Sequence, residues 1–197
     1  MRVRKPDMTL SLPLSLPVGW AGDILNFWFR EHGRESWFKR DDAFDAAITE
    51  RFLAHYESLA AQVPQIARDE PRSALAAILA LDQFPRNLFR AEARAFATDA
   101  HALQLARNAV GRGHDAALDV HERLFLYLPF EHSETAADQS RAVSLISGLG
   151  DAEYTRFALA HQDIITRYSR FPHRNAVLGR TSTGDELAFL QQPGSSF

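Results

Sequence analysis

Two short phrases of nearly the same sequence hold residues that could do chemistry: DQFPRN at 82–87 and RFPHRN at 170–175. Each joins a Phe-Pro step to an arginine and an asparagine, and the second adds a histidine. Guanidinium groups bind carboxylates and phosphates through paired hydrogen bonds, and an imidazole moves protons near neutral pH. A cluster of such groups would suit the binding, hydrolysis or isomerisation of a small anionic molecule.

A third proline step, Pro129-Phe130, is also followed by polar residues, and one histidine interrupts the apolar stripe of a long helix pattern. We therefore predict two groups of site residues. The candidates for proton transfer are His132, His173, Glu134 and His161. The candidates for anion binding are Arg86, Asn87, Arg90, Arg174, Asn175 and Arg180.

Each candidate also has a purely structural interpretation. An arginine that follows a helix, such as Arg86, can hydrogen-bond the free carbonyl groups and offset the helix dipole. Ser133 and Glu134 could serve only as an N-cap and a first-turn acid of the next helix. His161 could be a hydrogen-bonded histidine of the core. These alternatives stay open at the level of the sequence.

A metal site is a competing use of His132, Glu134, His161 and His173. However, neither H-E-x-x-H nor another spaced ligand motif is present, and the chain has no cysteine. Phosphate-binding loops and the G-x-S-x-G motif of hydrolases are also missing. We therefore predict no metal and no other cofactor.

The elements that must position these residues are helices, because apolar residues recur at helical spacing and no alternating strand pattern of useful length occurs. Phe44, Ile48, Phe52, Tyr56 and Leu59 form one stripe behind Asp41 and Asp42, which are suitable caps. Further helices are predicted over 23–29, 72–84, 94–110, 120–128, 133–148, 154–170 and from Thr183, whose spacing to Glu186 is that of a capping box. The sequence thus predicts an all-α, single-domain antiparallel bundle of about seven or eight helices.

The three polar phrases follow helices that we expect to stop at proline, because proline disfavours helical geometry in the residue before it. If long helices alternate in direction, the helices ending at 84, 128 and 170 finish at the same end of the bundle. The phrases would then form one shared rim. Asp82 opposes the dipole of its own helix unless a cation lies near, so we expect it to pair with Arg86 or to tie the phrases together through Arg174.

Composition limits the partners of the chain. Its 197 residues include 46% hydrophobic and 24% charged residues, with a net charge of -3, so no global field attracts nucleic acid or an anionic membrane. No apolar run is long enough to span a membrane. We expect a cytoplasmic protein with a loosely ordered leader at 1–20, one helical domain at 21–191 and a frayed tail at 192–197. The oligomeric state is not indicated.

Four phrases together resemble a bacterial family known as domain of unknown function nine hundred and twenty-four. They are ILNFWF, ILALDQFPRNLFR, LFLYLPFEHSE followed by Gln139, and RFPHRNAVLGRTSTGDELAFL. The resemblance covers about residues 22–191, implies a tetratricopeptide-like helical fold and adds Gln139 to the anion-binding candidates. It implies no activity. One departure is Tyr168-Ser169 where the family has Phe-Gly, and serine resists the positive φ that glycine tolerates.

A second function class follows by analogy with tetratricopeptide-like folds, which often bind peptides or proteins. In this interpretation the chain is a scaffold with an exposed apolar groove, lined by Trp28, Phe29, Trp37 and Phe38. Solvent exposure of both tryptophans, together with arginines that are all held in internal ion pairs, would favour the scaffold over the small-molecule site.

Overall fold

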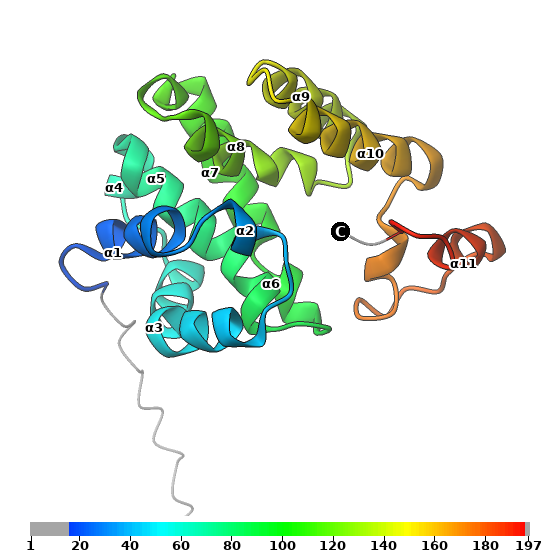
Figure 1. The fold of residues 1–197 in the computed structure, drawn as a ribbon, viewed down its shortest axis with the longest axis horizontal. Helices are drawn as coiled ribbons and strands as arrows, with labels where there is room; N and C mark the ends of the chain where they lie inside the picture. The colour runs from blue at the N-terminus through cyan, green and yellow to red at the C-terminus, as the bar shows by residue number, and fades with distance from the viewer. Residues whose placement is uncertain (1–15, 196–197) are drawn as a thin grey trace, which may run out of the picture.

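The computed structural model describes residues 16–195, and helices make up most of this range without any β-strand in it (Figure 1). The α-helices are α1 (Trp20–Asn26), α2 (Arg34–Trp37), α3 (Asp42–Ala61), α4 (Ile66–Asp69), α5 (Pro71–Ile78), α6 (Phe84–Leu88), α7 (Asp99–Gly111), α8 (Val120–Glu131), α9 (Ala136–Ser147), α10 (Ala152–Tyr168) and α11 (Gly184–Leu190). The predicted all-α class and single helical domain are confirmed.

Five shorter turns connect or extend these helices. Two are π-helical, η1 (Phe27–Glu31) and η2 (Leu79–Gln83), and three are 3-10 turns, η3 (Ala93–Phe96), η4 (His114–Ala117) and η5 (Pro172–Arg174). The turn η2 matters most, because it carries Asp82 between α5 and α6. π-helical turns inside helices are rare and often occur at functional sites.

Two predicted helix stops are wrong. Pro85 lies in the first turn of α6, where the missing N–H is harmless, so the chain continues as a helix to Leu88. Pro129 lies inside α8, which continues to Glu131. The predicted cap Ser133 is also wrong, because Thr135 caps α9 and the Ser133 hydroxyl donates to Asp138 instead. Ser169 has a φ of 59°, in the left-handed conformation that glycine adopts more easily than serine.

The main core lies where α1, α3, α5, α6 and α8 meet. Trp28 is buried there, and its ring contacts those of Phe84 and Phe125 at centroid distances of 5.8 and 5.4 Å. Trp37 is buried as well and donates its indole N–H to the carbonyl of Trp28 at 2.8 Å. Only Phe38 among the four expected groove residues is exposed. The exposed tryptophans that the scaffold interpretation expects are therefore not found, although Phe29 and Trp37 line part of a surface hollow described below.

The C-terminal segment forms a smaller second core. Phe171, Ile164 and Ile165 are buried together, and Tyr168 and Phe189 pack against them. In Figure 1 this segment descends from the end of α10, and α11 lies apart from the body that contains α3 and α6. The turn η5 thus belongs to a segment whose contact with the body is made largely by polar side chains, described below.

The expected leader and tail fall partly outside the described residues. Residues 1–15 of the expected leader and the last two residues of the expected tail, 196–197, lie outside the described residues. Within the described part, α1 begins at Trp20, and the hydroxyl of Ser195 donates to the carbonyl of Leu190 at 3.2 Å. The tetratricopeptide-like grouping stays a prediction.

The amino end of α8 is held by a capping box that we expect to be worth about 1 kcal/mol. One carboxylate oxygen of Asp119 accepts from the backbone N–H groups of His121 and Glu122, both at 2.9 Å. Replacing Asp119 by alanine removes this acceptor and should lower the free energy of unfolding by about 1 kcal/mol. Urea denaturation measures the change. Asp119→Asn keeps an acceptor and should lose less, and an equal loss in both variants would contradict this role.

Candidate functional site

The three polar phrases meet in the folded chain. Asp82 in η2 accepts a hydrogen bond from His132, which follows α8, with 2.8 Å between Oδ1 and Nδ1. The backbone N–H of Phe171 donates to Glu134 at 2.8 Å. Residues that are 37 to 50 positions apart are therefore in direct contact. The structure has the shared rim that the helix count predicts, although two of the helices end later than expected.

Two arginines from different phrases converge on one carboxylate. Arg86 binds Asp99 through its two terminal guanidinium nitrogens, at 3.0 and 3.1 Å. Arg174 binds the same carboxylate through one nitrogen, at 3.3 Å. Arg86 also donates to the backbone carbonyl of Asp82 and lies 3.5 Å from its carboxylate. The predicted tie between Asp82 and Arg174 is replaced, since Asp99 is the residue that joins Arg174 to Arg86.

Arg174 has an unusual environment for a cation. Its side chain is only 8% exposed, and its guanidinium lies over the rings of Phe96 and Phe171, at 4.7 and 4.5 Å from the ring centroids. The ion pair with Asp99 is its only hydrogen bond to a described residue, and its Nε has no acceptor. Burial and the neighbouring Arg86 lower the pKa of Arg174 to about 10. A guanidinium with so many unused donors is suited to receive a further acceptor.

Asp82 and His132 form a carboxylate–imidazole pair. Asp82 is fully buried, and although burial alone would raise its pKa, Arg86 and then His132 hold the pKa below the usual range. Burial and Arg86 lower the pKa of His132, so the ring is neutral near pH 7. An ionised carboxylate only accepts hydrogen bonds, so the Nδ1 of neutral His132 must carry the proton. The Nε2 atom is then a proton acceptor.

A second carboxyl–imidazole pair lies next to the first. Glu131 Oε1 is 3.1 Å from Nδ1 of His161, which is also 2.9 Å from the carbonyl of Phe157. The rings of His161 and His132 are 6.2 Å apart. Burial and the charge of Asp82 raise the pKa of Glu131 to about 8. Burial and the neighbouring His132 lower the pKa of His161 to about 3, so both groups are uncharged at neutral pH.

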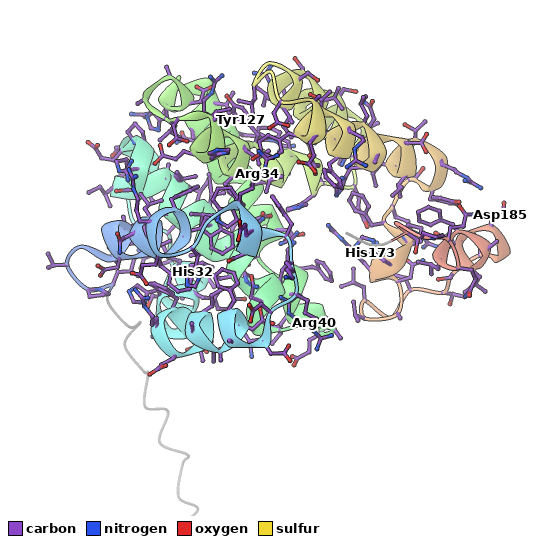
Figure 2. All side chains as sticks on the ribbon, viewed as in Figure 1. His32, Arg34, Arg40, Tyr127, His173 and Asp185 are labelled. Carbon is purple, nitrogen blue, oxygen red and sulfur yellow. The ribbon has the colours of Figure 1, made fainter. Side chains whose placement is uncertain are left out.

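His173 and Arg180 complete the C-terminal side of the cluster. Figure 2 labels His173 in the region between the helical body and α11. Burial and then the charges of Arg174 and Arg86 lower the pKa of His173 to about 4. Arg180 binds Glu134 through two nitrogens at 2.7 and 3.0 Å, and it donates to the carbonyl of Phe171 at 3.1 Å. This pair fixes the turn that presents Arg174.

Other predicted binding residues do other work. Arg90 and Asn87 both bind the carboxylate of Asp45 in α3, the latter at 2.7 Å. Gln139 donates to the backbone carbonyls of Glu131 and Ser133 at 2.6 and 2.7 Å, and so shapes the turn before α9. Asn175 is buried and donates to the hydroxyl of Ser182 at 3.0 Å. These contacts hold the turns in place, and a role of the four side chains in binding stays a prediction.

Sequence reasoning missed two members of the cluster, Asp99 and Glu131. Asp99 is the first residue of α7, where an acid is expected for the helix dipole alone. Glu131 ends α8 two residues beyond the proline that was expected to stop it. The adjacent histidine and the apolar run before Glu131 were the available signals of burial.

Two surface hollows lie away from this cluster. One, of about 480 Å³, is formed where α9 ends and α10 begins, from Ser147 to Leu159. The other, of about 330 Å³, lies between α1, η1, α2 and the start of α8 and is lined by Phe29, Trp37 and His121, among others. The cluster and these two hollows therefore occupy different parts of the molecule.

Two kinds of feature are absent from the described range, residues 16–195. It contains no group of three or more histidine, aspartate or glutamate side chains placed to hold a metal ion. It also contains no helix long and apolar enough to cross a membrane.

Comparison with known proteins places the chain in a family. A search of curated proteins found no match. One similar solved structure is that of the protein of unknown function ATU0120 from Agrobacterium tumefaciens, with 42% identity, a TM-score of 0.83, and coverage of 87% of this chain and 96% of that one. The family model described as bacterial protein of unknown function (DUF924) matches residues 24–194. The chain therefore belongs to the DUF924 family.

Proposed function

We propose that the cluster around Arg174 binds the carboxylate or phosphate group of a small molecule, and that His132 transfers a proton to or from that molecule. The observation that carries the proposal is the state of Arg174. This guanidinium is buried, yet it makes one 3.3 Å ion pair and leaves its Nε without an acceptor. Buried donors are normally satisfied, so the unused ones favour an acceptor supplied by a ligand.

The rings around Arg174 support its role as a binding group. The guanidinium lies over the rings of both Phe96 and Phe171, and these cation–π contacts restrict its movement. A fixed guanidinium loses little freedom when it binds an anion, which favours affinity. Arg86 adds a second positive charge nearby, and it also lies over the Phe96 ring at 5.6 Å. Two neighbouring guanidinium groups favour a ligand whose negative charge is delocalised over several oxygens.

The pair of Asp82 and His132 supports proton transfer. Asp82 fixes the ring orientation and the tautomer of His132, as the acid does in carboxylate–histidine catalytic pairs. The His132 side chain is 14% exposed, so a ligand in the cluster can approach its second nitrogen. A positioned base of this kind typically contributes about 10²–10⁴-fold to a rate. Hydrolysis or isomerisation of a small acid is the reaction class that fits.

Removal of the Arg174 charge should abolish most of the binding. We expect Arg174→Met to weaken the binding of inorganic phosphate or succinate by about 10- to 100-fold, because a hydrogen-bonded charge contributes about 1.5–3 kcal/mol. Isothermal titration calorimetry at constant ionic strength measures this. Arg107→Met is the matched control, because Arg107 also binds a buried carboxylate, that of Asp138, but outside the cluster. Equal affinities in the two variants would overturn the proposal.

The same titration, carried out at pH 5.5 in buffers of different ionisation enthalpy, tests whether an imidazole at the site takes up a proton when the anion binds. A bound anion offsets the charges of Arg174 and Arg86, which together with burial keep the pKa of His173 near 4. Binding should therefore raise this pKa and take up part of a proton. A binding enthalpy that does not depend on the buffer would speak against imidazoles at the site of binding.

A further inference from the structure

We propose that the carboxylate of Asp99 is a built-in competitor, which occupies the anion position of the Arg86–Arg174 pair until the acidic group of a ligand displaces it. This inference rests on the proposed function and adds to it how the site is regulated and which acidic groups fit. The juxtaposition is direct. Asp99 accepts from Arg86 at 3.0 and 3.1 Å and from Arg174 at 3.3 Å, as the carboxylate of a bound small molecule would.

Of the two carboxylates that pair with Arg86, that of Asp99 is the one that can move away from the arginines. Its side chain is 20% exposed, whereas that of Asp82 is fully buried. Asp82 is anchored by three neighbours, since it accepts from Gln83 at 2.6 Å and from His132 at 2.8 Å and pairs with Arg86. By contrast, the Asp99 carboxylate accepts its side-chain hydrogen bonds from described residues only from Arg86 and Arg174.

The departure of Asp99 leaves neither Arg86 nor Asp99 itself without a favourable partner, and it frees Arg174, whose one ion pair to a described residue was with Asp99, for the ligand. Arg86 keeps Asp82, both through the backbone carbonyl and through the carboxylate 3.5 Å away. Asp99 is the first residue of α7, a helix of 13 residues, where free backbone N–H groups and the dipole favour a carboxylate however its side chain turns. A change of side-chain rotamer is therefore sufficient to exchange one anion for another.

The two arginines do not depend on Asp99 for their positions. The Arg174 guanidinium lies over the rings of Phe96 and Phe171, and Arg86 lies over the same Phe96 ring. Asp99 also makes only one hydrogen bond with the Arg174 guanidinium, and it is long, at 3.3 Å. A ligand carboxylate placed between the two guanidiniums could bind both in the forked geometry that Arg86 now offers to Asp99. Carboxylates, or phosphate groups that present two oxygens in the same way, are thus the acids that fit.

The test is the affinity of Asp99→Asn for small anions. Asparagine keeps the shape of the side chain but removes the competing charge. We expect inorganic phosphate, succinate or both to bind at least about tenfold more tightly than they bind the parent chain, because a site that is open only a fraction of the time has its affinity reduced by that fraction. Calorimetric titration at constant ionic strength gives the affinities, and the two ligands show which acidic group is preferred.

Asp45→Asn is the matched control. It also removes a carboxylate from an arginine, Arg90, but that arginine is more exposed and lies outside the cluster. Its affinity for the same anions should equal that of the parent. If Asp99→Asn does not fold, as judged by its unfolding transition, Asp99→Ser replaces it in the same titration.

The outcomes separate the two proposals. If Asp99→Asn binds anions as weakly as the parent or more weakly, while Arg174→Met still abolishes binding, Asp99 positions the arginines and is not a competitor. If neither the parent nor Asp99→Asn binds any of the anions, the proposed anion site itself is wrong. If Asp45→Asn gains as much as Asp99→Asn, the gain reflects net charge alone, and the competitor is again rejected.

Discussion

Asp82→Ala is expected to lower the free energy of unfolding by about 3–5 kcal/mol, because it removes one partner from a buried set of charges. The carboxylate of Asp82 is fully buried between Arg86, His132 and Gln83. Its loss leaves the His132 N–H and the Gln83 amide without their acceptor and removes one of the two counter-charges of Arg86. Urea denaturation of the parent and the variant at pH 7 measures the difference.

Asp42→Ala is the control for this substitution. Asp42 also pairs with an arginine, Arg40, but both side chains are largely exposed. An exposed pair of this kind contributes about 0–1 kcal/mol. If Asp82→Ala also costs less than about 1 kcal/mol, the cluster does not hold its charges in the arrangement described above.

Glu131→Gln is expected to change how stability depends on pH. Burial and Asp82 raise the pKa of Glu131 from 4.5 to about 8 in the folded chain. Below pH 4.5 the carboxyl is protonated in both states. Between 4.5 and 8 the unfolded chain releases its proton while the folded chain keeps it, so the parent loses stability as the pH rises. Glutamine resembles the protonated acid and does not titrate.

The free energy of unfolding of Glu131→Gln, relative to that of the parent, should therefore rise between pH 4.5 and 8 by on the order of 4 kcal/mol. The difference between the two proteins cancels the contributions of other titrating groups. Urea denaturation at intervals from pH 4.5 to 9 provides both curves. Glu57→Gln, at an exposed glutamate, controls for the amide substitution itself. Parallel curves for Glu131→Gln and the parent would show that the carboxyl is not held in its protonated form.

Much of the fold could be predicted from the sequence, because its helices have clear caps and apolar stripes. Asp41 caps α3 through the backbone N–H groups of Ala43 and Phe44, and Thr183 and Glu186 form the predicted capping box of α11. These signals are local, so a single sequence contains them. The convergence of the three phrases also follows from the order of the long helices.

The errors arise where tertiary contacts decide. Pro85 and Pro129 were expected to end helices, but the first lies in an initial turn and the second lies in a buried helix whose packing outweighs the lost hydrogen bond. The role of Asp99 could not be predicted, because its arginine partners are 13 and 75 positions away. The pairing of Glu131 with His161 depends in the same way on the packing of α8 against α10.

These errors changed the meaning of the site more than its position. Arginines were expected at the rim, and Arg86, Arg174 and Arg180 are there, but each has an acidic partner inside the chain. A ligand of the site that we propose would therefore compete with an internal carboxylate rather than enter an open positive patch. Arg174 is the arginine with the weakest such partner and the most unused donors, so we assign it the central role.

The most direct test of this assignment is a ¹H–¹⁵N NMR titration of the Arg174 Nε–H resonance, identified by its loss in Arg174→Met. We predict that succinate or inorganic phosphate moves this resonance along a saturable curve, because the anion supplies the acceptor that Nε now lacks. The account is contradicted if the Arg174 Nε–H resonance does not move at high anion concentration. The resonances of exposed arginines serve as the reference, because they respond only to ionic strength.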